Sequence, residues 1–277
     1  MKFFNRKTIL SGLIAVLFLS TGFAQELELP RKSPKASISY SVGLTDITIN
    51  YSSPSVRERA VWGKLVPWGK VWRAGANEAT TVEFSTDVYV EGELLPAGKY
   101  SFFLIPKKEE KWTAIFNKVA DQWGAYEYDE SQDVLRVEVM TKTSKINEER
   151  LTYSIVDQAM DKGYIRFAWS TRRAYIRFKV EVMEQALANV DAALKSADDD
   201  RKWLIYAQAA DFMMENEKYQ AKALDMAKNS TDLFNHSWNW YVRAKAEARM
   251  EDYKSAVASA KKAVEYGENN AKDNFYK

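Results

Sequence analysis

Two segments of the chain combine indole rings with charged and amide side chains, a mixture found in sites that bind small polar ligands. The first runs from Tyr51 to Ala79 and the second from Asn117 to Asp129. If the two segments meet, they form an aromatic-walled cleft in which flat rings stack on apolar faces and polar groups fix hydroxyls. The residues predicted to bind a sugar, a peptide or another small polar ligand there are Trp68, Lys70, Trp72, Arg73, Asn77, Glu78, Asp121, Gln122, Trp123 and Tyr126.

The same residues admit other interpretations. Loop tryptophans often close the open end of a sandwich, Arg73 and Glu78 can neutralise each other, and Asn77 can bond the backbone in a turn. Glu78 and Asp121 are alternatively the two carboxylates of a glycosidase, which lie roughly 5 to 9.5 Å apart in such enzymes. The sequence gives no distance between them, so no catalytic residue is assigned.

The composition excludes several kinds of site. The chain has no cysteine, so disulfides, cysteine nucleophiles and cysteine metal ligands are impossible. Its single histidine, His236, lies in the C-terminal half, where we expect it to cap a helix or lie on the surface. A histidine-rich metal site or a Ser-His-Asp triad cannot be built in the N-terminal half. We therefore expect no metal and no cofactor.

The first 24 residues have the features of a cleaved export signal. Basic residues precede an apolar run from Ile9 to Leu19, and the small residues Gly22 and Ala24 follow it. The run is shorter than the roughly 20 apolar residues that span a bilayer. Cleavage after Ala24 predicts a periplasmic or secreted protein without membrane insertion, and an uncleaved N-terminal anchor is the alternative.

The net charge gives no argument for a polyanionic partner. The whole chain carries +2, and removing the three positive charges of the leader leaves about −1. Nucleic-acid-binding domains usually carry a strongly basic surface. We therefore expect no nucleic acid as a partner.

Residues 33–182 are predicted to form an antiparallel β-sandwich or flattened barrel. Apolar and polar residues alternate in 36–42, 47–51, 135–139, 165–169 and 176–180, the period of a half-buried strand. The apolar stretches 100–105 and 112–116 are typical of more deeply buried strands. Turn residues separate these segments, at Glu91-Gly92 and Pro96-Ala97-Gly98.

Residues 183–277 are predicted to be all α-helical. They contain no proline and one glycine, Gly267. Tyr206 and Tyr219 are echoed 34 residues later by Trp240 and Tyr253, and this period resembles that of tetratricopeptide repeats. A helix at 183–194 is expected to pack on the two repeats. Such repeats present a concave surface to proteins, so Tyr206, Trp240 and Tyr253 are predicted to bind a protein partner.

The loop residues also carry a resemblance to a known family. The stretches Tyr51-Ser52-Ser53-Pro54-Ser55-Val56 and Leu65 to Thr80, with Leu95 to Ser101 and Asp121 to Tyr126, resemble the signature of the DUF2911 family. The resemblance covers residues 33–182. It implies one β-rich domain of an exported bacterial protein, common in the Bacteroidetes, and it supplies no activity or catalytic residue. The helical repeats lie outside it.

These features favour a non-enzymatic exported binding protein. Its β domain would bind a small polar ligand, glycan or peptide, and its helical repeats a protein partner. The alternatives are a glycan- or peptidoglycan-directed hydrolase using Glu78 and Asp121, and a purely structural scaffold of the cell envelope.

Overall fold

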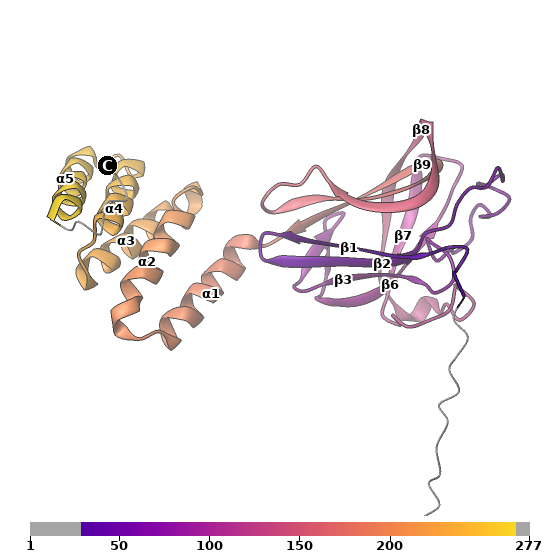
Figure 1. Cartoon of the computed structure of the whole chain (residues 1–277), viewed down its shortest axis with the longest axis horizontal. Coiled ribbons are helices and arrows are strands. Elements are labelled where there is room, and N and C mark those ends of the chain that lie inside the picture. The colour runs from indigo at the N-terminus through magenta and orange to yellow at the C-terminus, as the bar shows by residue number, and fades with distance from the viewer. Residues whose placement is uncertain (1–28, 270–277) are drawn as a thin grey trace, which may run out of the picture. The chain divides into compact units, whose positions relative to one another are not determined.

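The computed structural model describes residues 29–269, coloured by residue number in Figure 1. The predicted export signal, residues 1–24, lies outside the described residues. In the part of the chain that is described, no helix combines the length and apolar character needed to cross a bilayer.

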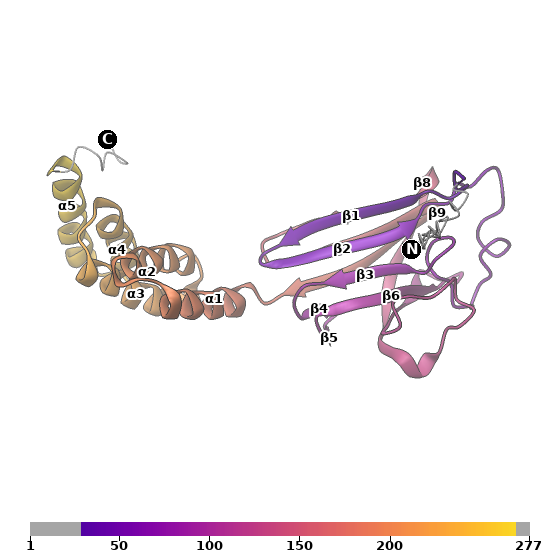
Figure 2. The same cartoon turned by 60° about the horizontal axis from the view of Figure 1, so that its bottom comes forward.

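Within these residues, the N-terminal part forms one antiparallel sheet of nine strands in the order β1-β2-β3-β6-β7-β8-β9-β4-β5 (Figure 2). The strands are β1 (Lys35–Val42), β2 (Thr45–Ser52), β3 (Thr80–Phe84), β4 (Val88–Val90), β5 (Glu93–Leu95), β6 (Gly98–Ile105), β7 (Lys111–Asn117), β8 (Asp133–Val156) and β9 (Lys162–Val180). The antiparallel β prediction is confirmed. The sheet is open rather than a closed barrel, because its edge strands β1 and β5 do not pair with each other.

The two longest strands, β8 and β9, turn this single sheet into two facing layers. Register shifts between Thr143 and Thr152 interrupt their pairing, and such irregularities bend strands. Figure 1 shows the β8–β9 hairpin curving over the strands of the N-terminal half. Across the core, the Tyr153 ring of β8 lies 4.9 Å from the Tyr51 ring of β2 and 6.3 Å from the Phe102 ring of β6, between centroids.

The period-two pattern decides which side chains enter this core. In β2, Ile47, Ile49 and Tyr51 are buried, while Asp46 and Asn50 are exposed. Burying each large apolar side chain contributes roughly 1.5–3 kcal/mol. The polar side chains on the opposite face of the sheet are left free to build a site.

Five α-helices follow within the described residues, and they have a hydrophobic core of their own. They are α1 (Val182–Ser196), α2 (Asp199–Met213), α3 (Gln220–Leu233), α4 (Ser237–Arg249) and α5 (Tyr253–Asn269), with a short 3-10 helix, η2 (Glu217–Tyr219), before α3. The predicted helix at 183–194 is therefore confirmed as α1, and its residues Met183, Leu187 and Val190 pack against the helical core.

The 34-residue period is visible in contacts between α2 and α4. Asp211 forms an ion pair with Lys245 at 2.8 Å, and Glu215 forms one with Arg249 at 3.0 Å. The partners in each pair are 34 residues apart, so they occupy equivalent positions in the two helical hairpins α2–α3 and α4–α5.

The single histidine has the capping role expected of it. His236 is the N-cap of α4, and its Nδ1 accepts a hydrogen bond from the Trp238 backbone N–H at 3.1 Å. Asn239 completes a capping box, because its Oδ1 accepts from the His236 backbone N–H at 3.1 Å.

Candidate ligand-binding site

The structure brings the two polar, aromatic segments together. The Ala79 backbone N–H donates to the Gln122 carbonyl at 3.0 Å, and the Gly124 N–H donates to the Asn77 carbonyl at 3.1 Å. Glu78 and Trp123 lie opposite each other between these two bonds. The end of the first segment and the middle of the second therefore form a short antiparallel pair.

The tryptophans of the first segment face the core of the sheet. Trp62, Trp68 and Trp72 are half-buried and pack against the main hydrophobic core. The Trp62 ring lies 4.9 Å from that of Trp112, and the Trp72 ring stacks on Trp169 at 5.8 Å. In this arrangement Trp68 and Trp72 pack against the core, and their role in binding stays a prediction.

A glycine makes this packing possible. Gly63 has a positive φ of 80°, and a Cβ at this position would collide with the Trp68 indole nitrogen. Only glycine adopts this backbone conformation at little cost while leaving room for the ring.

A pocket of about 620 Å³ lies beside the pairing of the two segments. Polar residues from three adjacent strands run across it, because Ser37 of β1 lies opposite Asn50 of β2, and Asn50 lies opposite Thr81 of β3. The pocket is lined by Lys35, Ala36, Ser37, Asn50, Tyr51, Ser52, Glu78, Ala79, Thr81, Lys99, Ala120, Asp121 and Gln122.

The charged groups of the pocket are of both signs. Lys35 and Lys99 supply ammonium groups, and Glu78 and Asp121 supply carboxylates. Lys35 Nζ lies 3.8 Å from Glu78 Oε1, and both side chains are exposed, at 70% and 38%. An exposed pair of this kind contributes little to stability, so a ligand can replace either partner at small cost.

Buried polar contacts hold the loop that carries Asp121 and Gln122. Gln122 Nε2 donates to the Val119 carbonyl at 2.7 Å and to Ser101 Oγ at 3.3 Å, while its Oε1 is buried without a hydrogen-bond partner. Ser101 Oγ donates to the Val119 carbonyl at 2.7 Å. The loop is thereby fixed to the outer face of β6.

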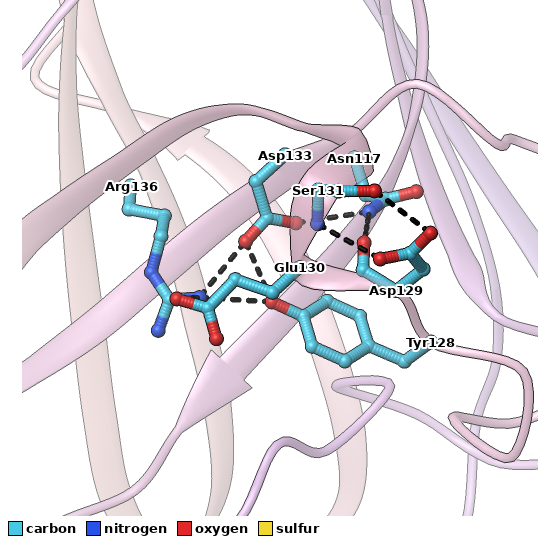
Figure 3. Close-up of polar contacts among 7 residues, drawn as sticks. All are labelled: Asn117, Tyr128, Asp129, Glu130, Ser131, Asp133 and Arg136. Carbon is cyan, nitrogen blue, oxygen red and sulfur yellow. Dashed lines mark hydrogen bonds and ion pairs between the residues drawn. The ribbon is translucent and has the colours of Figure 1, made fainter.

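A second set of contacts, shown in Figure 3, anchors the end of the same loop around Asp133. Tyr128 Oη donates to Asp133 Oδ2 at 2.6 Å, and Arg136 Nη1 donates to the same oxygen at 2.9 Å. Asn117 Nδ2 donates to Asp133 Oδ1 at 2.9 Å. Burial, the hydrogen bond to Asp133 and the negative charge of that carboxylate all raise the pKa of Tyr128, so its phenol remains a donor at neutral pH.

We expect Asp133→Ala to lower the free energy of unfolding by about 2–3 kcal/mol, because it leaves the Tyr128 hydroxyl without its acceptor and the Asn117 amide with only the Asp129 carbonyl. The control is Glu130→Ala. Glu130 pairs with Arg136 at 3.1 Å, but its side chain is 74% exposed, and such pairs contribute at most about 1 kcal/mol. Urea denaturation of both variants measures the difference, and equal losses would contradict the anchoring role of Asp133.

Of the ten residues predicted to bind a ligand, Glu78, Asp121 and Gln122 line the pocket. Asn77 instead fixes the backbone, because its Nδ2 donates to the Ser33 carbonyl and to Ser52 Oγ, both at 3.2 Å. The remaining six lie outside the lining of this pocket, with Trp68 and Trp72 on the core, Arg73 half-buried, and Lys70, Trp123 and Tyr126 exposed.

The sequence reasoning missed the pocket residues that come from the strands. Ser37 and Asn50 occupy the polar positions of alternating segments, and their outward orientation follows from that alternation. Their alignment with Thr81 and Lys99 depends on the strand order β1-β2-β3-β6, which alternation does not reveal.

The three residues predicted to bind a protein partner differ in exposure. Trp240 is buried, and its ring stacks on Tyr266 at 6.4 Å and lies 4.1 Å from Lys262 Nζ. Tyr206 is half-buried against the helical core. Tyr253, at the start of α5, is 66% exposed.

Across residues 29–269, no group of three or more histidine or acidic side chains is arranged to hold a metal ion.

The comparisons with known proteins identify the β domain. The family described as "Protein of unknown function (DUF2911)" matches residues 33–178, just over half of the chain. No curated protein and no solved structure matches significantly. The match spans eight of the nine strands and nearly all of β9, together with both segments that flank the pocket. The chain therefore belongs to the DUF2911 family.

Proposed function

We propose that this chain is an exported binding protein whose β domain holds a small polar ligand, a glycan or a peptide, in the pocket between β1, β2, β3 and the loop at 120–122. The observation that carries the proposal is the polar lining of this 620 Å³ pocket. Its size falls within the roughly 300–1,000 Å³ of small-molecule sites.

The polar groups of the pocket define the ligand that fits it. Ser37, Asn50 and Thr81 offer hydroxyl and amide groups that both donate and accept hydrogen bonds. The ammonium groups of Lys35 and Lys99 and the two carboxylates can bind hydroxyls or the charged ends of a peptide. These groups favour a ligand rich in hydroxyls or amides over an apolar one.

Two further parts of the proposal rest on the sequence outside the pocket. The N-terminal 24 residues have the composition of an export signal, which supports a periplasmic or secreted protein. The helical hairpins α2–α3 and α4–α5, with their 34-residue period, support a tetratricopeptide-like module that binds a protein. The exposed Tyr253 is its most accessible predicted contact.

The test of the pocket compares two tryptophan substitutions on β1. We expect Ser37→Trp to fill the pocket and abolish ligand binding, while Ser39→Trp leaves binding unchanged. Ser37 lines the pocket, whereas Ser39 lies two residues further along the same face of the strand, outside the lining. Both positions are exposed, so both variants are expected to fold.

Binding is measured by amide chemical shifts of the chain without its leader, with a chitooligosaccharide, a muramyl peptide and a short mixed peptide as probes. Shifts of pocket residues that vanish in Ser37→Trp and persist in Ser39→Trp support the proposal. The absence of any shift with these probes, or equal losses in the two variants, would contradict it and favour the structural scaffold.

A hydrolase is the second candidate, because Glu78 and Asp121 line the same pocket. Two carboxylates that face one cleft can protonate a leaving group and activate water or form a glycosyl intermediate. The binding experiment also distinguishes hydrolysis from binding. Cleavage of the muramyl peptide or the chitooligosaccharide, followed in the same samples, would replace the binding proposal with the enzymatic one.

A further inference from the structure

Arg73 is a half-buried cation without a partner. Its Nε is buried and has no hydrogen-bond acceptor, and no ion pair or hydrogen bond joins its guanidinium to another residue of 29–269. Burial lowers the pKa of Arg73 from its ordinary value. Glu78, the acidic residue closest to Arg73 in sequence, lies 3.8 Å from Lys35 Nζ instead.

Two other arginines among the described residues that have little exposure, Arg173 and Arg243, are neutralised. Arg173 donates to the Ser170, Arg172 and Ile146 carbonyls and lies 3.3 Å from Glu148. Arg243 forms an ion pair with Glu247 at 2.9 Å. A buried charge without such compensation destabilises the fold, so the position of Arg73 calls for an anion that the described residues do not supply.

Arg73 lies beside the loop that carries Gly124 and Tyr126. Its Nη1 lies beside Gly124, 3.5 Å from the place where a Cβ would stand, and the Tyr126 phenol is near enough to influence its pKa. Gly124 has a positive φ of 68°, and a side chain there would press on the Tyr126 ring at 3.0 Å. Trp123 and Tyr126 are 56% and 83% exposed on the same loop.

We infer that Arg73, beside Gly124 and Tyr126, binds an anionic group, a carboxylate or a phosphate. The guanidinium presents a planar fork of N–H donors that matches both groups. The adjacent Tyr126 ring supplies the apolar contact that a carrier of the anion would make. This site is distinct from the lining of the pocket between β1, β2 and β3, so it goes beyond the proposed function.

Arg73→Met is expected to have two opposite effects on stability, one without added anion and one with it. Removing an uncompensated buried charge is expected to raise the melting temperature without added anion. The same substitution is expected to abolish any stabilisation by inorganic phosphate or acetate. If Arg73 only supported the fold, Arg73→Met would lower the melting temperature.

The experiment compares melting temperatures in phosphate, acetate and chloride at equal ionic strength, with Arg166→Met as the matched control. Arg166 is half-buried on β9, and its Nε also lacks a partner, but it lies outside the loop. Phosphate stabilises proteins generally. The decisive quantity is therefore the anion-induced rise in melting temperature that Arg166→Met retains and Arg73→Met loses. Phosphate acting alone would indicate a phosphorylated ligand, and acetate acting as well would indicate a carboxylate.

Amide chemical shifts of the unsubstituted chain give a measurement that needs no variant. Phosphate or acetate is expected to shift the resonances of Gly124 and Tyr126, and Arg73→Lys is expected to weaken this effect because lysine lacks the planar fork. Either a lower melting temperature in Arg73→Met with the anion effect intact, or no shift of these resonances, would overturn the inference. Since Ser37→Trp leaves Arg73 in place, loss of pocket binding with retained anion binding separates the two proposals.

Discussion

Replacing Trp72 with alanine is expected to lower the free energy of unfolding of the β domain by about 3–5 kcal/mol. The Trp72 ring stacks on Trp169 at 5.8 Å and meets the edges of Trp62 at 5.9 Å and Phe167 at 5.8 Å. Truncation removes these contacts and leaves a cavity against the main core. Urea denaturation followed by near-ultraviolet circular dichroism, which reports on packed indoles, measures the loss.

Trp123→Ala is the matched control for this prediction. Both tryptophans lie in the segments that meet beside the pocket, but the Trp123 side chain is 56% exposed and is not part of the core. Surface substitutions usually change stability by less than about 0.5 kcal/mol. Comparable losses in the two variants would show that the inward packing of Trp72 is not what stabilises the domain.

The largest effect in the helical part is expected from Asn239→Ala, at about 2–4 kcal/mol, because several buried groups lose their partner at once. The fully buried Asn239 amide donates to the Ser230 carbonyl at 3.2 Å, to Ser230 Oγ at 3.0 Å and to the Phe234 carbonyl at 2.8 Å. These bonds join the end of α3 to the start of α4. Far-ultraviolet circular dichroism during thermal unfolding follows the loss of helix.

Asn189→Ala provides the comparison, since Asn189 is exposed on α1. Alanine has the higher helix propensity, so this variant is expected to keep or slightly raise the stability of the helices. If Asn239→Ala were equally harmless, the α3–α4 connection would have to be held by apolar contacts alone.

The sequence predicted those elements whose period is strong. Alternation located β1, β2, the start of β8 and both ends of β9, and the 34-residue echo located the hairpins α2–α3 and α4–α5. It missed β3, β4 and β5, because strands of three to five residues are too short to show a period. The full length of β8 was also missed, since the polar stretch between Thr143 and Glu149 interrupts the apolar pattern.

The candidate site was predictable only in part, because loop side chains follow no period and the strand residues of the pocket depend on the strand order. Glu78, Asp121 and Gln122 stand in loops of unusual composition, and composition alone indicated them. The direction of a loop side chain has no period, so the sequence did not reveal that Trp68 and Trp72 face the core while Trp123 faces solvent. The strand residues of the pocket required the pairing order of four strands, which is a property of the whole fold.

The pairing of β4 with β9 determines where the β domain can be excised. Val90 lies opposite Phe178 and Val88 opposite Val180, so the final residues of β9 hold a strand from the first third of the chain. The family match stops at residue 178, yet Val180 and Val182 are buried in the same core. A fragment that ends at the family limit would lose two of the three β9 residues that pair with β4, whereas one extended through Val182 keeps this pairing and the buried residues Val180 and Val182.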